Sequence, residues 1–550
     1  MISIPALFCI DSYKLGHADQ YPEGTTKVYS NFTPRSAKHF SNQGAIRNDI
    51  VFFGLQGLLI EMNRSFDAFF KQDKKAAIDE FVSVVEPFVG PNGVNRKRFE
   101  DLHDLQYLPI KVKALPEGSY VTVGVPVFTI TNTHLDFYWI VNYLETWLSC
   151  ELWKLCTSAT IADSYKKILE KYNELTCDSK DFMPWQLHDF SVRGMSGIAD
   201  AAKTGMGHLL SSFGSDNIPA VYAAKRYYGA EGFVAGSVPA TEHSVMCAGG
   251  QETEIETFKR LLRIYPSGVV SIVSDTWDYF NVITSIASEL KGEILNRKPD
   301  QNGLAKVVFR QDSGDPVKII CGYNIITEEE LNEDIYKADY YEVVKTKDGK
   351  YYFIEVDEEY DPHDNSTYTY NYSLCKEISE AEAIGSVAAL DKIFGSTTNS
   401  KGYKTINPRV GLIYGDSITL GRCKEILEGL KNKGYSSDNI VFGIGSYTYQ
   451  YQTRDTFGFA MKATYVEING KGQEIFKDPK TDNGTKKSAK GLLKVTREGS
   501  KYKLQDQVTP QEEAQGELKI VLEGGFMYNL QTFEGIRNHL QDEFDNSLKG

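Results

Sequence analysis

The chain lacks the sequence patterns that mark several common protein classes. Its eight cysteines include no C-x-x-C pair, the spacing typical of zinc sites and of thioredoxin-like redox sites. No stretch reaches the roughly 18 apolar residues that cross a bilayer, and the N-terminus has no basic segment followed by an apolar core. Scattered cysteines in a long chain indicate reduced thiols. These absences predict a cytoplasmic protein without a signal peptide and without a membrane partner.

Basic residues are also few relative to acidic ones. The chain has 60 lysines and arginines against 74 aspartates and glutamates, a net charge of −14. Because nucleic-acid phosphates attract basic surfaces, we expect no nucleic-acid partner. A small anionic ligand stays compatible with this charge if basic side chains converge locally. With 550 residues, 41% of them hydrophobic, the chain is long enough for about three or four domains.

What the sequence does contain, between Trp185 and Tyr447, is a repeating unit. A short apolar run ends in polar or glycine residues and a helical stretch follows, as in parallel βα units. The runs end at His188-Asp189-Phe190, Glu242-His243, Ser274-Asp275, Arg310-Gln311-Asp312, Gly415-Asp416 and Gly443-Ile444-Gly445-Ser446. Both a βα barrel and an open doubly wound sheet collect such strand ends on one side. At least six units and no glycine-rich dinucleotide fingerprint favour an α/β fold with a βα barrel over the doubly wound sheet.

The segments outside this repeat predict flanking domains. β-type patterns cover residues 109–131 and the region after Arg454, whereas helical spacing covers residues 137–175. The acidic, tyrosine-rich stretch 327–385 contains a strong hairpin signal at residues 345–350 and is expected to be an inserted β subdomain. We therefore predict a composite β-rich domain from residues 1–155 and 455–550, a barrel from 156–325 and 396–454, and an insert at 326–395.

Two segments about 50 residues apart concentrate aromatic and ionisable side chains. Residues 187–194 include Phe190 and Arg193, and residues 236–244 end in Glu242, His243 and Ser244. An aromatic ring, an arginine and a histidine at neighbouring strand ends can hold a flat ring beside an anionic leaving group. This combination predicts transfer chemistry on a phosphorylated sugar. A lone histidine is often structural, but the adjacent carboxylate favours a function for His243.

Two aspartates, Asp275 and Asp312, lie at the ends of separate apolar runs. Two carboxylates near one site suit a hydrated Mg²⁺ ion or hydrogen bonds to ribose hydroxyls. Each could instead cap the helix that follows, because aspartate is a preferred N-cap residue. The cap and the site are equally consistent with Asp275, whereas Arg310 and the flanking residues 313–316 favour a site at Asp312.

Glycine turns and a set of basic residues are candidates for phosphate binding. Gly415-Asp416 and Gly445-Ser446 precede helices or loops, where backbone N–H groups can seat a phosphate. Glycine also ends strands for steric reasons alone. The basic candidates would bind a pyrophosphate only if they converge, and otherwise they are solvated surface residues; they are Arg35, Arg454, Lys462 and Lys477.

Several ordered motifs resemble those of the nicotinamide phosphoribosyltransferases, which are type II phosphoribosyltransferases. The resemblance runs from about Asp11 to about Gly491, is broken mainly by the 327–385 insert, and is closer to bacterial or phage versions than to animal ones. Its motifs are Asp11-Ser12-Tyr13-Lys14, Phe52-Phe53-Gly54-Leu55-Gln56, His188-Asp189-Phe190-x-x-Arg193-Gly194, Ser237-Val238-Pro239-Ala240-x-Glu242-His243-Ser244, Val273-Ser274-Asp275, Arg310-x-Asp312-Ser313-Gly314, Gly415-Asp416, Thr453-Arg454-Asp455 and Phe476-Lys477-Asp478-Pro479.

This resemblance implies a fold, a reaction and a set of partners. The fold would be an irregular α/β barrel with flanking β-rich domains, in a homodimer whose active sites are shared between subunits. Nicotinamide and phosphoribosyl pyrophosphate would give nicotinamide mononucleotide and pyrophosphate, in NAD salvage. Mg²⁺ would be needed, and ATP would stimulate the reaction through a phosphorylated His243.

The resemblance also implies roles for individual residues. Phe190 and the other subunit's copy of Tyr13 would sandwich the pyridine ring, and Asp216 would accept a hydrogen bond from the carboxamide, near Ser237. Asp312 would hold the ribose hydroxyls, and Asp275 with Asp312 would contact Mg²⁺. Gly415, Asp416, Gly445 and Ser446 would surround the nucleotide phosphate, although animal members carry more glycine at residues 446–447. Pyrophosphate or ATP would contact Arg35, Arg193, His243, Arg310, Arg454, Lys462 and Lys477.

Two alternatives stay open from the sequence. A nicotinate phosphoribosyltransferase would share the fold, but a carboxylate at Asp216 would repel the carboxylate of nicotinate. A non-catalytic signalling or binding protein on the same fold is an alternative of another class. The missing signal peptide and the full set of acidic, arginine and histidine candidates argue against it.

Overall fold

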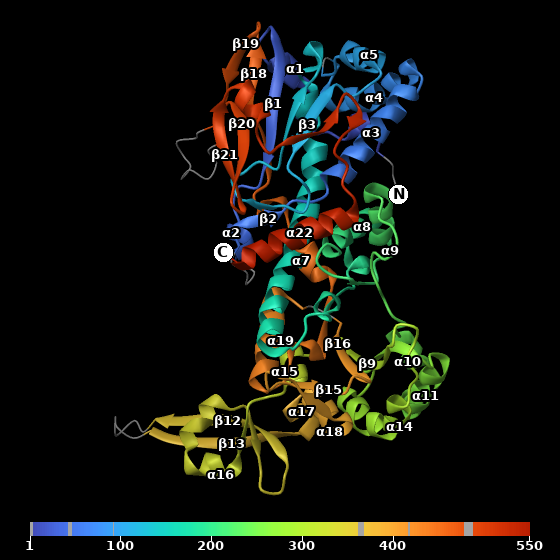
Figure 1. Cartoon of the computed structure of the whole chain (residues 1–550), viewed down its shortest axis with the longest axis vertical. Helices are drawn as coiled ribbons and strands as arrows, with labels where there is room; N and C mark the ends of the chain where they lie inside the picture. The colour runs from blue at the N-terminus through green and yellow to red at the C-terminus, as the bar shows by residue number, and fades with distance from the viewer. Residues whose placement is uncertain are drawn as a thin grey trace.

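The computed structural model describes residues 4–41, 47–91, 93–360, 368–415, 418–477 and 488–549. Figure 1 shows a long molecule with a large β sheet in its upper half and a second, parallel sheet with its helices in the lower half. Helices α7 (Glu145–Thr176) and α22 (Phe533–Lys549) lie between these two parts. Among the described helices, none combines the length and the apolar character needed to cross a membrane.

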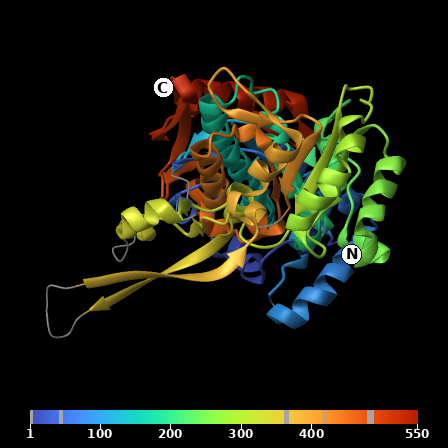
Figure 2. The same ribbon diagram turned by 90° about the horizontal axis from the view of Figure 1, so that it is seen from below.

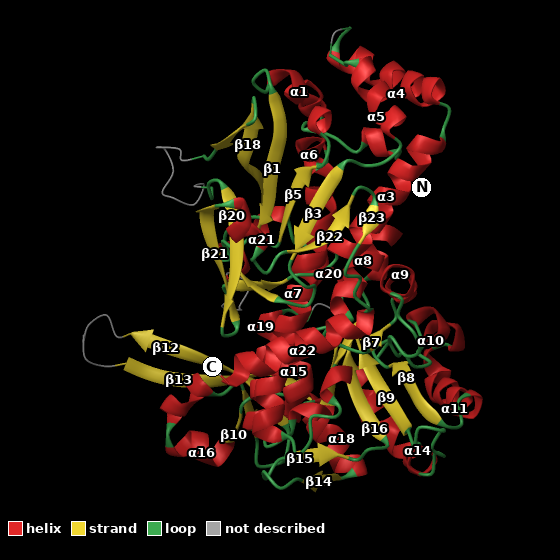
Figure 3. Ribbon diagram, turned by 45° about the horizontal axis from the view of Figure 1, so that its top comes forward, coloured by secondary structure: helices red, strands yellow, loops and turns green. Residues whose placement is uncertain are grey.

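The lower part is a barrel of parallel strands. Six strands pair in the order β7-β6-β17-β16-β9-β8, and Figure 3 shows β16, β9 and β8 side by side. Their bounds are β6 Leu187–Asp189, β7 Gly214–Ser215, β8 Gly268–Val273, β9 Ala305–Gln311, β16 Val410–Tyr414 and β17 Ile440–Ile444. Between the outer strands β7 and β8 lies the segment 236–240, which bridges Gly214 through Gly236 and Ser271 through Ala240, both in parallel. This segment closes the ring, and the predicted irregular barrel is confirmed.

Helices follow most barrel strands and cover them from outside. In β9, buried and half-buried residues alternate, whereas every residue of β16 is buried, as expected for a strand covered on both faces. The covering helices include α8 Ile198–His208, α9 Ile218–Tyr228, α10 His243–Gly249, α11 Glu254–Ile264, α14 Lys291–Leu295, α15 Pro316–Cys321, α18 Ser386–Phe394, α19 Leu420–Asn432 and α20 Ser446–Gln450.

The upper part is a sheet that both ends of the chain build together. Seven strands pair in the order β19-β18-β1-β5-β3-β22-β23. At its centre Tyr29 pairs with Tyr465 on one side and with Thr131 on the other, all antiparallel. The strands are β1 Thr25–Thr33, β3 Ile110–Ala114, β5 Phe128–Asn132, β18 Ala460–Ile468, β19 Lys471–Glu474, β22 Lys519–Glu523 and β23 Phe526–Met527. The predicted composite domain is therefore present.

Helices and hairpins complete the upper part. Helix α7 has 32 residues and confirms the helical spacing over residues 137–175; α3 Leu55–Lys71, α4 Lys74–Val89 and α5 Arg96–Leu105 flank the sheet. The hairpin β18–β19 turns at Asn469 and Gly470, both with positive φ, as a tight hairpin turn requires. A second hairpin joins β20 Leu492–Glu498 to β21 Lys501–Val508.

The insert forms its own four-stranded sheet, β10-β11-β12-β13. Its strands are β10 Ile325–Thr327, β11 Val343–Lys345, β12 Tyr351–Tyr360 and β13 Tyr368–Ile378. The hairpin predicted at residues 345–350 joins β11 to β12 and is confirmed. Figure 2 shows the arm β12–β13 projecting away from the body. The insert has a small apolar core of its own around Ile326, Leu331 and Val344.

Candidate active site

The carboxyl ends of the parallel strands form one end of the barrel, which we call the barrel mouth. Parallel strands place the residues that follow them at a common edge, where βα-barrel sites lie. Contacts among side chains at this end connect eight residues, which we call the mouth cluster. They are His188, Phe190, Asp216, Ser237, His243, Asp275, Arg310 and Asp312.

One half of the mouth cluster surrounds the carboxylate of Asp216, directly after β7. Its Oδ1 accepts hydrogen bonds from Nε2 of His188, at 2.9 Å, and from the hydroxyl of Ser237. Burial by itself raises the pKa of Asp216, but the hydrogen bonds from His188 and Ser237, aided by the charges of His188 and Arg310, lower it overall. Asp216 is therefore an ionised acceptor at the barrel mouth.

An aromatic ring lies between this carboxylate and the arginine of the mouth cluster. The rings of His188 and Phe190 have centroids 4.5 Å apart and are tilted by 36°. The guanidinium carbon of Arg310 lies 5.9 Å from the centroid of the Phe190 ring, within the range of a cation–π contact. Nη2 of Arg310 is 3.4 Å from Oδ2 of Asp312. The arginine thus connects the aromatic half of the site to its acidic half.

The acidic half consists of two aspartates and a histidine. Nε2 of His243 lies 3.8 Å from Oδ1 of Asp275 and 3.8 Å from Oδ2 of Asp312. Oδ2 of Asp275 accepts hydrogen bonds from the backbone N–H of Asp312 and the hydroxyl of Ser313. Nδ1 of His243 is 3.4 Å from the hydroxyl of Thr276. The imidazole is half exposed, so it can meet a ligand while two carboxylates face its other nitrogen.

Neither aspartate is a helix cap, the alternative that the sequence left open. The cap of α12 (Tyr279–Asn281) is Asp278, three residues after Asp275, and the cap of α15 is Asp315, three residues after Asp312. The cap roles thus belong to other aspartates in the same loops. Asp275 and Asp312 themselves face each other and His243 across strands β8 and β9.

The glycine turns lie at the same mouth, and their packing is tight. A Cβ atom on Gly415 would lie 1.9 Å from Oδ1 of Asp312, so only glycine lets that carboxylate occupy its place. Gly445 is the N-cap of α20, and the side chain of Ser446 lies against Gly194, next to the exposed Arg193. The adjacent backbones are joined by the hydrogen bond from the N–H of Phe190 to the oxygen of Ile444. The prediction for Asp416 lies outside the described residues.

The predicted basic residues converge, but in the upper domain. Burial comes first in lowering the pKa of Lys462, and the charges of Arg35, Lys477 and Lys14 lower it further, against the opposing effect of Glu145. Nε of Arg35 donates a 2.7 Å hydrogen bond to the oxygen of Gly458, in the turn after Arg454. We call Arg35, Arg454, Lys462 and Lys477 the basic cluster. Among the described residues, the hydrogen bond of Arg35 and the charges around Lys462 come from the upper domain and from α7, and none of them comes from the mouth cluster.

Tyr13 lies in a 3-10 turn, Ser12–Gly16, of the upper domain. Its side chain is 62% exposed, with the edge of His17 at a centroid distance of 5.2 Å. The next residue, Lys14, is buried and pairs with Glu145 of α7 at 2.6 Å, which anchors the turn. The tyrosine ring is therefore presented to solvent from a fixed base.

Comparison with known proteins decides the family. Residues 185–523 match the nicotinate phosphoribosyltransferase (NAPRTase) family, and residues 6–80 match the nicotinamide phosphoribosyltransferase N-terminal domain. A nicotinamide phosphoribosyltransferase of Acinetobacter baylyi is 48% identical over 547 residues, 98% of either chain. The chain belongs to the nicotinamide phosphoribosyltransferase family. The enzyme of that name from Mycoplasma pneumoniae is 34% identical over 499 residues, 88% of this chain and 94% of its own.

A solved structure supports the fold of this phosphoribosyltransferase family member. Nicotinate-nucleotide pyrophosphorylase from Pyrococcus furiosus superposes with a TM-score of 0.52 and 14% identity, covering 98% of this chain and 95% of its own. At that identity the likeness concerns the fold alone. It agrees with the predicted barrel and its flanking β-rich domain.

Two contacts of this phosphoribosyltransferase site were not predicted from sequence. His188 lies in a motif that drew attention to Phe190 and Arg193, yet its own bond to Asp216 depends on strand β7, which has only two residues. Thr276 follows Asp275 and reaches His243 from the next loop. In both cases the residue pattern of the motif could not indicate the partner, because Asp216 and His243 each follow a different segment of the barrel.

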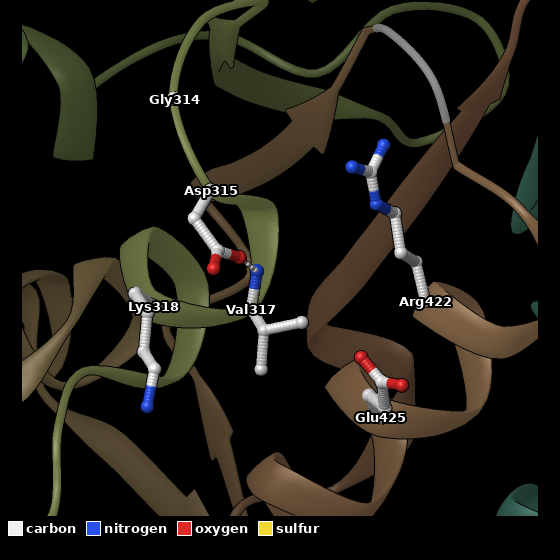
Figure 4. A pocket seen from close by; sticks show the side chains of 6 residues that line it. All are labelled: Gly314, Asp315, Val317, Lys318, Arg422 and Glu425. Atoms are coloured by element: carbon white, nitrogen blue, oxygen red, sulfur yellow. Dashed lines mark hydrogen bonds between the residues drawn. The ribbon is translucent and has the colours of Figure 1, made fainter.

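A hollow of about 570 Å³ lies beyond the Asp312 loop, between α15 and α19. Figure 4 shows its lining, with the Asp315 carboxylate accepting a hydrogen bond from the N–H of Val317. The lining residues are Gly314, Asp315, Val317, Lys318, Arg422 and Glu425. They include two cations, two carboxylates and no member of the mouth cluster. The hollow is therefore separate from the candidate active site and has no excess of positive charge for a phosphate.

Proposed function

We propose that this chain transfers the phosphoribosyl group of phosphoribosyl pyrophosphate to nicotinamide, giving nicotinamide mononucleotide and pyrophosphate for NAD salvage. The observation that carries the proposal is the ionised Asp216 beside Phe190 and Arg310 at the mouth of a barrel of this family. A relative with this activity in its name is 48% identical over 98% of the chain.

Recognition of nicotinamide rests on one ring and one carboxylate. The pyridine ring stacks on Phe190, because offset stacking suits a flat heteroaromatic. Within the described part of the chain, no hydrogen bond reaches Oδ2 of Asp216, whose Oδ1 is held twice. Oδ2 therefore accepts the carboxamide N–H. The negative charge of Asp216 repels the carboxylate of nicotinate.

The transfer step needs positioning and charge more than a protein base. As the bond between C1 of the ribose and pyrophosphate loosens, positive charge develops on the sugar and negative charge on the leaving group. Asp312 holds the ribose hydroxyls, and Arg310 and Arg193 stabilise the pyrophosphate. The pyridine nitrogen attacks C1 directly, and because it carries no proton, no general base is required.

The residues at the mouth fit a Mg²⁺ ion that is bound mainly through water and phosphate. Oδ1 of Asp275 is buried and has no hydrogen-bond partner among the described residues, and the carboxylate of Asp312 faces the same histidine. Across the described residues, no group of three or more acidic, histidine or cysteine side chains forms a cage. Asp275 and Asp312 would hold the ion, which would supply charge neutralisation for the pyrophosphate.

His243 is the residue through which we propose that ATP stimulates the reaction. Its half-exposed imidazole can accept a phosphoryl group from ATP on a ring nitrogen, releasing ADP. The carboxylates of Asp275 and Asp312 lie 3.8 Å from Nε2 and stabilise a positive imidazole. Thr276 at Nδ1 fixes the orientation of the ring.

A cytoplasmic setting, inferred from cysteines that are all free thiols, stays a prediction.

The complete site is proposed to form in a homodimer. Within one chain, the basic cluster and the exposed ring of Tyr13 lie in the upper domain and the mouth cluster lies in the barrel. A second copy would bring its Tyr13 over the pyridine ring and its basic cluster to the pyrophosphate, completing the cation set that this multiply charged leaving group needs. The mass of the protein in solution tests this assembly directly.

A nicotinate phosphoribosyltransferase is the second candidate, because the family model over residues 185–523 carries that name. Asp216→Ser separates the two substrates. We expect this variant to lose preference for nicotinamide, since the serine neither repels a carboxylate nor supplies a charged acceptor. Equal relative kcat/KM values for the two substrates in the variant and the wild type would contradict the role of Asp216.

The function itself is tested by turnover. Purified protein with Mg²⁺, nicotinamide and phosphoribosyl pyrophosphate is expected to form the mononucleotide, detected by chromatography. Nicotinate in place of nicotinamide is the matched control. If the protein formed no nucleotide with nicotinamide or with nicotinate, the alternative of a non-catalytic binding protein would replace the enzyme assignment.

A further inference from the structure

We propose that His188 is a positioning residue that sets the selectivity of this site for an amide over an acid. The inference rests on the proposed function and deepens it, because it assigns the selectivity to a pair of residues instead of to Asp216 alone. His188 need not touch the substrate: it acts through the carboxylate that does.

The position of His188 is defined on three sides. Nε2 lies 2.9 Å from Oδ1 of Asp216, and the imidazole face lies against Phe190 at 4.5 Å. On the third side is Gly214, which pairs with His188 across strands β6 and β7. A Cβ on Gly214 would lie 3.0 Å from Nδ1, so the absence of a side chain there gives the ring its room. The side chain of His188 is only 12% exposed.

This arrangement makes His188 a donor to Asp216. The carboxylate is ionised and can only accept, so Nε2 must carry the proton in the contact. Ser237 donates to the same oxygen. Two donors on Oδ1 fix the rotation of the carboxylate and direct Oδ2 away from both of them. The ring of Phe190 and the acceptor Oδ2 are thereby held in one geometry by a single imidazole.

Loss of the donor would change which substrate the site tolerates. Burial raises the pKa of Asp216, and the hydrogen bond from His188 is the largest effect that lowers it, so removing that bond favours the protonated acid. A protonated Asp216 can donate to the carboxylate of nicotinate and no longer repels it. Other ionisable groups near the pair are Arg310 from β9, Asp189 from β6 and His208 from α8, whose pKa burial lowers, and they stay in place in a His188 variant.

The test compares kcat/KM for nicotinamide and for nicotinate in the wild type, His188→Ala, His188→Gln and Ser237→Ala. A hydrogen bond to a charged group corresponds to a factor of roughly 10 to 100, so we expect the ratio of the two values to fall by that factor in His188→Ala. In His188→Gln the amide restores an N–H donor near the place of Nε2, and the ratio should recover most of its value. The KM for phosphoribosyl pyrophosphate should stay near that of the wild type in both.

The outcomes separate a donor from a merely structural residue. Equal losses for both substrates, with an unchanged ratio, would overturn the inference, and so would a ratio that falls as far in His188→Gln as in His188→Ala. If His188→Ala does not fold, His188→Phe takes its place, because it keeps a ring beside Phe190 but carries no N–H donor, and an unchanged ratio there would also overturn the inference. Ser237→Ala measures separately what the second donor to Oδ1 contributes. A wild type without preference for nicotinamide would refute the proposed function first.

Discussion

Replacing Gly415 with alanine tests how closely the reaction depends on the position of the Asp312 carboxylate. The added Cβ would lie 1.9 Å from Oδ1 and 3.0 Å from Cγ of Asp312, and 3.5 Å from Cδ of Arg310. Ordinary contacts of a Cβ begin near 3.4 Å. The carboxylate oxygen must therefore move by about 1.5 Å, from 1.9 Å to 3.4 Å away from the new Cβ. The backbone of Gly415 is outside the left-handed region, so alanine adds no backbone strain.

A displacement of about 1 Å in a positioning group costs on the order of 100-fold in rate. We therefore expect kcat/KM for phosphoribosyl pyrophosphate to fall by about 100-fold in Gly415→Ala, measured from initial rates of mononucleotide formation. Gly411→Ala is the matched control in the same strand segment, because its Cβ would meet mainly the flexible side chain of Lys306, at 3.0 Å. The reasoning is refuted if Gly415→Ala retains near wild-type activity, or if both variants lose activity equally.

Two further predictions concern the phosphate groups. His243→Ala should abolish ATP hydrolysis, measured as phosphate release, and persistent hydrolysis would remove His243 as the phosphoryl acceptor. Because burial and the neighbouring cations lower the pKa of Lys462, its charge is lost at a lower pH than that of an ordinary lysine, whose pKa is 10.5. The KM for phosphoribosyl pyrophosphate should therefore rise with pH below 10.5, and Lys462→Arg, which stays charged, should flatten that rise; an identical pH profile in the variant would contradict a role in binding.

The sequence could predict the strands that are long enough to show a pattern. Strands β8, β9, β16 and β17 each have at least five residues, and the ends predicted for them agree with the structure. Strand β7, by contrast, has only Gly214 and Ser215, too short for any periodicity, and the segment before His243 makes bridges without forming a strand. The closure of the barrel and the bond between His188 and Asp216 both depend on these two pieces, so they needed the structure.

The composite domain shows a different limit. Alternation predicted that residues at both ends of the chain form strands, and the turn at Asn469-Gly470 predicted one hairpin. The pairing of Tyr29 with Tyr465 could not be predicted, because nothing local to either strand specifies a partner more than 400 residues away. The same holds for the basic cluster: its residues were candidates, but their convergence follows from that long-range pairing of β1 with β18.

Three glycines at the barrel mouth explain why this site tolerates so little additional volume. A Cβ on Gly443 would lie 2.7 Å from the Cα of Gly415, one on Gly415 would reach Asp312, and one on Gly194 would reach Ser446. Consecutive strand ends around the ring therefore approach through positions without side chains. At two of them the backbone N–H already donates to a backbone oxygen, that of Ser191 for Gly194 and that of Gln311 for Gly415, so these glycines provide close approach of the strand ends and not a free N–H group. A substitution at any of the three is then expected to act on the geometry of the neighbouring strand end before it acts on a ligand.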